Sequence, residues 1–148
     1  MSITIATSNL TDVAFLSAVS SRTLSLEQFR HGDHLRLAWL KLHACPFPAA
    51  LDSVRKTIRA FAAHHGKAAI YHETITTAWV VLLASHDEPT FAEFLSANEC
   101  LLNAKLLERY WSPQALFSSN ARESWVPPDR APLPVDLAIL NSLTKDGC

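Results

Sequence analysis

Apolar residues recur at helical spacing in most segments of this 148-residue chain, and this periodicity constrains the fold more than any other feature. Between residues 33 and 43, for example, the apolar side chains lie at positions i, i+3, i+4 and i+7 on one face of a helix: Leu35, Ala38, Trp39 and Leu42. No two segments alternate apolar and polar residues as neighbouring strands do, and 3 glycines are too few for a loop-rich all-β chain. The sequence therefore predicts an all-α fold.

Capping signals indicate where the helices begin and end. Ser25 is followed at the third position by glutamine and Thr90 by glutamate, which are capping-box patterns. Pro48 suits the first turn of a helix, Gly66 suits a C-terminal cap, and Gly32 is expected to interrupt or kink the chain before a helix that begins at Asp33. The predicted helices span residues 11–20, 26–29, 33–43, 48–65, a segment that begins at 72–74 and ends near 85, 90–110 with a break near 98, and a short stretch from 112.

These segments predict one domain, 1–148, built as a bundle of about six helices. Its core is expected over about 11–120, followed by a Pro-rich segment and tail at 121–148. Four prolines lie in eight residues, which forbids a helix there and favours an extended path over the surface: Pro127, Pro128, Pro132 and Pro134. We expect Trp125 to anchor this segment and a last helix, Val135 to Leu143, to dock on the bundle.

The charge of the chain is nearly balanced, with 13 basic and 14 acidic residues. No stripe of lysine and arginine supplies the positive surface that binding to a phosphate backbone requires, so nucleic acid is not expected as a partner. No apolar run approaches the roughly 20 residues of a membrane span, and the first residues lack the basic and apolar regions of a signal peptide. We expect a cytoplasmic protein without a membrane partner; the sequence leaves its oligomeric state open.

Two short blocks with unusual chemistry lie where loops are expected to enter helices. The first is His31-Gly32-Asp33-His34 and the second begins at Tyr71-His72-Glu73-Thr74. A spacing of i and i+3 allows the rings of His31 and His34 to approach one ion if the backbone is helical, and His72 would supply a third nitrogen. The sequence therefore predicts a metal site formed by His31, His34 and His72.

Three imidazoles leave a coordination position open on a divalent transition metal such as zinc, iron, copper or manganese. Such a position lowers the pKa of bound water or admits an oxygen ligand. Glu73 is the candidate catalytic residue, as a general base for proton transfer, and Asp33 could orient His34. This hypothesis makes the protein a small enzyme that carries out hydrolysis or oxygen chemistry on a small-molecule substrate.

Two alternatives use the same residues without a metal. In the first, His31, Asp33 and Thr74 cap helices, while His34 and His72 are core histidines with hydrogen-bond partners. The protein would then be a non-catalytic ligand-binding or protein-interaction module. In the second, a metal-free pocket uses histidine as acid or base. The enzyme hypotheses require a pocket that solvent can reach between the two helix starts, whereas the module hypothesis allows the histidines to lie apart.

The same blocks carry a resemblance. The segments FRHGDHLRLAWLKL, YHETITTAWVVLL and ARESWVPPD resemble a group of small bacterial proteins of unknown activity that combine F-x-H-x-x-H-L-R-x-A-W with Y-H-E-T-x-T. The resemblance spans roughly Phe29 to Pro134 and implies that the blocks belong to one module. The chain is also similar to HD-type metal hydrolases in placing a histidine before a later histidine–acid pair, although the pair here is His72-Glu73 and not His-Asp.

Overall fold

The computed structural model describes residues 7–135, and all regular secondary structure in this range is helical, which confirms the predicted all-α fold. Seven α-helices follow one another: α1 (Asp12–Ser20), α2 (His31–Ala44), α3 (Phe47–His64), α4 (Glu73–Leu83), α5 (Phe91–Ala97), α6 (Pro113–Leu116) and α7 (Ser119–Glu123). Five 3₁₀ helices lie before or between them: η1 (Thr7–Asn9), η2 (Leu26–Gln28), η3 (Ala68–Ile70), η4 (Glu99–Leu102) and η5 (Ala104–Arg109). The helix predicted over 135–143 lies outside the described residues except for its first position.

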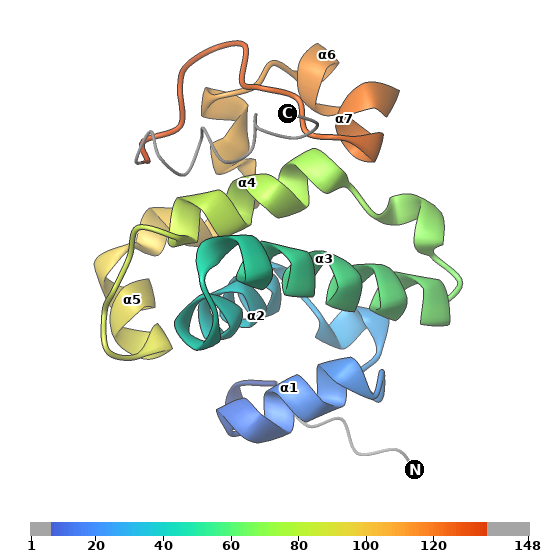
Figure 1. Ribbon diagram of the computed structural model, residues 1–148, viewed down its shortest axis with the longest axis vertical. Helices are drawn as coiled ribbons and strands as arrows, with labels where there is room; N and C mark the ends of the chain where they lie inside the picture. Colours follow the sequence, from blue (N-terminus) through green and yellow to red (C-terminus); the bar gives the residue numbers. More distant parts are fainter. Residues whose placement is uncertain (1–6, 136–148) are drawn as a thin grey trace.

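Helix α4 lies in the middle of the molecule, with α2 and α3 on one side and α6 and α7 on the other (Figure 1). Helix α1 packs against α3 at the far end from α6 and α7. Nine of the eleven residues of α4 are buried because the helix is covered from both sides. Its first turn therefore lies close to several elements at once. The candidate site lies where these elements meet α4.

Helix α2 begins two residues earlier than predicted. It starts at His31 and not at Asp33, so Gly32 lies inside the first turn and does not interrupt the chain. A carboxylate oxygen of Asp33 accepts a hydrogen bond from the backbone N–H of Arg30 at 2.9 Å, while the amide of Asp33 donates to the Arg30 carbonyl. This reciprocal cap stabilises a start before the glycine. The earlier start places His31 on the helix.

The chain after α5 does not continue as the α-helix predicted up to Tyr110 beyond the break. The predicted break at Asn98 is confirmed, but two 3₁₀ helices, η4 and η5, follow it. The side-chain amide of Asn98 donates to the carbonyl of Phe94 at 2.9 Å, and the side chain of Asn103 accepts from the amide of Lys105 at 3.1 Å. Such local bonds from asparagine compete with the α-helical ladder, which explains the tighter, irregular path.

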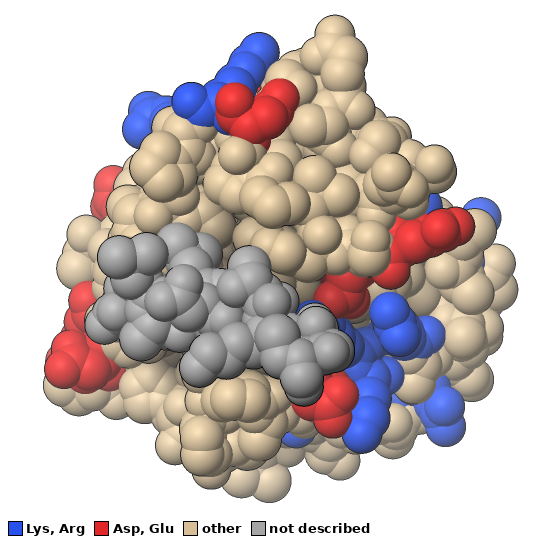
Figure 2. Space-filling model, turned by 45° about the horizontal axis from the view of Figure 1, so that its top comes forward, with Lys and Arg blue, Asp and Glu red and all other residues tan. Residues whose placement is uncertain are grey.

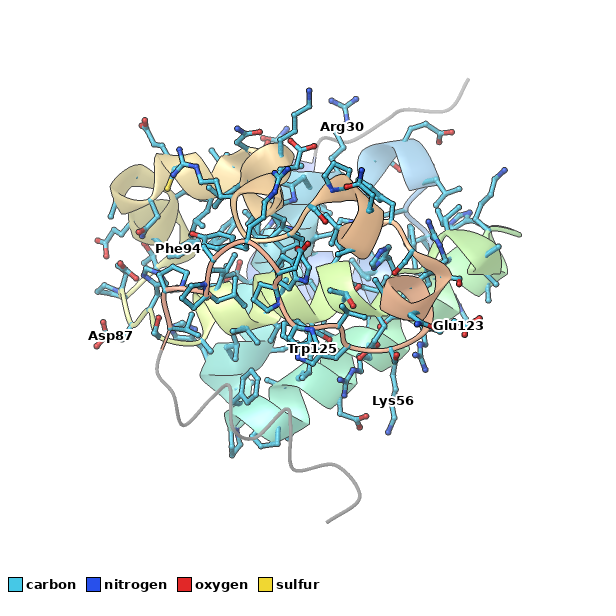
Figure 3. The ribbon with its side chains drawn as sticks, turned by 90° about the horizontal axis from the view of Figure 1, so that it is seen from above. Arg30, Lys56, Asp87, Phe94, Glu123 and Trp125 are labelled. Atoms are coloured by element: carbon cyan, nitrogen blue, oxygen red, sulfur yellow. The ribbon has the colours of Figure 1, made fainter. Side chains whose placement is uncertain are left out.

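The segment after α7 is held by partly buried hydrogen bonds to α4 and to Trp111. The hydroxyl of Thr74 donates to the carbonyl of Ser124 at 2.7 Å and accepts from the amide of Val126 at 3.1 Å. The indole of Trp111, which is fully buried, donates to the carbonyl of Val126 at 2.9 Å. Viewed from above, Trp125 lies over α4 (Figure 3). These bonds fix the chain as it leaves α7.

Charged side chains of both signs lie beside one another on the face shown in Figure 2, and the surface between them is largely uncharged. The labelled residues Arg30, Lys56, Asp87 and Glu123 lie at the periphery of the molecule (Figure 3). Among the helices of residues 7–135, none combines the length and the apolar character that crossing a membrane requires.

Candidate functional site

A pocket with a volume of about 740 Å³ opens between α2, α3 and α4 and the segments 104–108 and 116–117. This volume falls within the range of pockets that hold small organic molecules, roughly 300–1,000 Å³. Most of the lining is apolar. The apolar lining residues of the three long helices are Ala38, Val54, Ile58, Phe61, Ala62, Ile75, Trp79 and Val80. A largely apolar ligand would therefore find a matching surface.

His31, His34 and His72 all line this pocket. The two helix starts singled out in the sequence therefore meet at one site, even though about forty residues separate them in the chain. The bonding of the three imidazoles differs, however, and it decides what each ring can do.

His72 is the N-cap of α4, and both of its ring nitrogens have partners. Nδ1 accepts a hydrogen bond from the backbone N–H of Ile75 at 3.1 Å, and Nε2 lies 2.7 Å from the carbonyl oxygen of Leu116. Because an amide only donates, the proton of the neutral ring is assigned to Nε2, which donates to Leu116. Burial lowers the pKa of His72, and the nearby charge of Arg122 acts in the same direction. The ring begins α4 and connects it to α6.

His31 has one ring nitrogen engaged. Its Nε2 lies 2.9 Å from the carbonyl oxygen of Leu101, so this nitrogen carries the proton and donates it. The ring packs edge-on against Trp79 with their centroids 4.5 Å apart. Its Nδ1 has no hydrogen-bond partner within the described part of the chain and is left as an acceptor. His31 therefore offers the pocket one lone pair.

His34 has no hydrogen-bond partner among residues 7–135, and it packs against Phe29 with their ring centroids 4.3 Å apart. The pKa of His34 is lowered from 6.5 to about 4, mainly by burial and in addition by the proximity of His31, while Asp33 acts in the opposite sense. The ring is therefore neutral near neutral pH. A neutral imidazole carries one donor and one acceptor, and here both are left for a bound molecule.

The predicted metal site of His31, His34 and His72 stays a prediction, and the bonding of the three rings bears on it. Within residues 7–135, no group of three or more histidine, cysteine, aspartate or glutamate side chains is placed to hold a metal ion. His72 has no lone pair to offer, since Nδ1 accepts from an amide and Nε2 carries the proton. A metal ligand needs a free ring nitrogen. The three histidines share a pocket without forming a coordination shell.

Glu73, the predicted general base, is not among the residues that line the pocket and belongs to a network of charged and hydroxyl groups. Its Oε2 lies 2.6 Å from Nε of Arg55 and 3.1 Å from the hydroxyl of Thr77, and its Oε1 accepts from the hydroxyl of Tyr71 at 2.6 Å. Arg59 lies 3.5 Å from Oε1. Both carboxylate oxygens are therefore occupied, and the arrangement supports a structural role for Glu73.

The capping roles considered for these blocks are confirmed only in part. Asp33 is a cap, through its bond to the Arg30 amide. His31 is instead the first residue of α2 and bonds to a distant carbonyl. The cap of α4 is His72 and not Thr74, whose hydroxyl reaches the segment after α7. A histidine seldom serves as an N-cap, which is why the sequence pattern did not indicate it.

Several lining residues were not foreseen from the sequence. Ile70 and Phe117 line the pocket and are 58% and 59% exposed, and the charged lining residues Lys67, Lys105 and Glu108 are exposed as well. They belong to short 3₁₀ turns, loops and the end of α6, where no periodicity or motif indicates which way a side chain points.

Comparisons of this chain with models of protein families, with curated proteins and with solved structures find no significant match.

Proposed function

We propose that this protein binds a small, largely apolar organic molecule in the pocket between α2, α3 and α4. One observation supports this proposal most directly. The lining is apolar, and it contains one neutral imidazole, His34, that has no hydrogen-bond partner among the described residues. Ligand pockets are typically apolar, with a few polar groups that fix the orientation of the ligand. His34 supplies a donor and an acceptor for this purpose, and Nδ1 of His31 supplies a second acceptor.

The environment of His34 favours binding over proton transfer. A general base works best with a pKa near the operating pH, and a pKa of about 4 makes His34 a weak base at neutral pH. A neutral ring still forms hydrogen bonds with a hydroxyl, amide or carbonyl group of a ligand. Such a bond is strong in an apolar pocket, because water does not compete for it.

Filling the pocket tests this proposal. The neutral fluorescent probe N-phenyl-1-naphthylamine should bind to the parent protein with increased emission. Ala38 on α2 and Ala62 on α3 are both buried and line the pocket. Ala38→Leu and Ala62→Leu should each weaken probe binding at least tenfold, because the added atoms occupy the volume that the ligand needs.

Ala60→Leu is the matched control, since Ala60 lies on the same helix as Ala62, is exposed and does not line the pocket. It should bind the probe as the parent does. Thermal unfolding of each variant separates loss of the pocket from loss of the fold. If the parent fails to bind the probe, or if both filled variants fold and bind it unchanged, the proposal is wrong.

The metal-dependent enzyme predicted from the sequence stays a separate hypothesis. It requires the ring of His72 to leave the Ile75 amide and the Leu116 carbonyl so that a nitrogen becomes free. It also requires Glu73 to leave Arg55 if that carboxylate is to act as a base. Elemental analysis of the purified protein distinguishes the two hypotheses, because only the metal-dependent enzyme should retain stoichiometric metal.

A further inference from the structure

Charge is distributed unevenly between the interior and the edge of the pocket. The buried lining residues include no lysine, arginine, aspartate or glutamate. A charged ligand group placed there would lose its hydration without gaining a partner of opposite charge, which costs several kcal/mol or more. A ligand that carries a charge must therefore keep it at the edge.

All charged lining residues are exposed, and two of the three are lysines: Lys67, Lys105 and Glu108. Within residues 7–135, neither lysine forms an ion pair, although other basic residues such as Lys56 and Arg55 do. Glu108 has no ion pair in that range either, so the edge carries a net charge of one positive unit. Its ammonium groups are available to a ligand.

The exposed apolar residues complete this edge. Ile70 and Phe117 leave more than half of their surface in contact with solvent, and both line the same pocket as the two lysines. A molecule that enters would cover these side chains with its apolar part while its end remains near the ammonium groups. Lysine side chains suit this geometry, because their stems contact apolar surface while the charged ends stay in water.

We propose that the ligand is an amphipathic monoanion: its apolar body fills the pocket, and an anionic group such as a carboxylate lies where the lining is exposed, near Lys67 or Lys105. This inference rests on the proposed function. Beyond that function, it specifies that the ligand is negatively charged and where its charged group lies. Glu108, the third charged residue of the exposed lining, disfavours a second negative charge.

Three ligands with the same alkyl chain test the inference on the full chain: decanoate, 1-decanol and decylamine, which are anionic, neutral and cationic at neutral pH. Titration calorimetry should give the tightest binding for decanoate and the weakest for decylamine. In the Lys67→Gln/Lys105→Gln double variant, decanoate should bind roughly 2- to 30-fold more weakly, the range expected for two exposed ion pairs. The affinity for 1-decanol should not change. High salt should weaken decanoate binding in the parent only.

Lys56→Gln is the control, because Lys56 is an exposed lysine that does not line the pocket, and it should leave decanoate binding unchanged. Glu108→Gln should strengthen decanoate binding. If all three ligands bind equally, or if the double variant binds decanoate as the parent does, the inference about charge is wrong while the proposed function stands. If none of the three ligands binds, and the neutral probe does not bind either, the proposed function itself fails.

Discussion

Arg55 presents two guanidinium nitrogens to the same oxygen of Glu73: its Nε and one terminal nitrogen each lie 2.6 Å from Oε2. Glu73 is 6% exposed, and the side chain of Arg55 is 29% exposed. The pair joins the middle of α3 to the first turn of α4. Because Tyr71 and Thr77 also donate to this carboxylate, its lone pairs are satisfied in a setting where an unpaired charge would be costly.

Glu73→Gln should therefore destabilise the protein by about 2–4 kcal/mol, since it leaves the cation of Arg55 partly buried without a counter-charge. Urea unfolding followed by circular dichroism measures this loss. Asp52→Asn is the control: it breaks the exposed pair between Asp52 and Lys56 and should change stability little. A Glu73→Gln variant as stable as the parent would contradict the structural role and restore interest in Glu73 as a catalytic base.

The lowered pKa of the half-buried imidazole of His34 predicts a dependence of stability on pH. Its pKa is about 4 in the folded protein and 6.5 in the unfolded chain. Between these two pKa values the unfolded chain binds more protons than the folded protein does. The stability should therefore fall as the pH decreases from about 6.5 to about 4. Below a pH of about 4, His34 causes no further loss of stability. The loss from His34 should be no more than about 3 kcal/mol. His72, whose pKa is also lowered, contributes with the same sign.

Urea unfolding at several pH values between about 4.5 and 6.5 checks this dependence, because this window lies above the acid range in which carboxylates such as Asp129 titrate. His34→Leu should show a clearly smaller loss of stability on acidification than the parent. His64→Leu, which replaces an exposed histidine, is the control and should follow the parent. If the free energy of unfolding of His34→Leu depends on pH as steeply as that of the parent, the ring of His34 does not titrate as expected.

The hydroxyl of Thr74 should account for a large part of the attachment of the C-terminal segment. Thr74→Val keeps the shape of the side chain but leaves the Ser124 carbonyl and the Val126 amide without their partner. We expect a loss of about 1–3 kcal/mol and faster proteolysis after residue 124. Thr57→Val on α3 is the control. Equal protease resistance in the two variants would mean that other contacts, such as the hydrogen bond from Trp111 to Val126, are enough to hold the C-terminal segment in place.

Metal analysis decides between the pocket and the three-histidine centre. Protein purified without an affinity tag and incubated with zinc, iron, copper or manganese should retain no stoichiometric metal, because His72 uses both ring nitrogens within the fold. Elemental analysis of the parent beside His31→Ala, His34→Ala and His72→Ala provides the measurement. Near-stoichiometric metal in the parent that each substitution abolishes would establish the metal site and overturn this prediction.

Sequence alone determined the parts of this protein that depend on near neighbours in the chain. Thr11, Ser25 and Thr90 accept hydrogen bonds from amides three residues ahead, and Gly66 adopts the positive φ of 70° expected of a helix C-terminus. These features, the apolar faces of the helices and the break at Asn98 are local. Such local features can be predicted from the periodicity of apolar residues and from capping residues.

Tertiary structure decided what the chemically unusual blocks do. The sequence showed that His31, His34 and His72 stand at helix starts. It could not show that the carbonyl of Leu116 would accept a hydrogen bond from His72, or that Arg55 would pair with Glu73. These partners lie 44 and 18 positions away in the chain. Whether an imidazole or carboxylate is free for a ligand depends on which groups the packed helices bring within hydrogen-bonding distance. That is set by long-range packing, which no local pattern encodes.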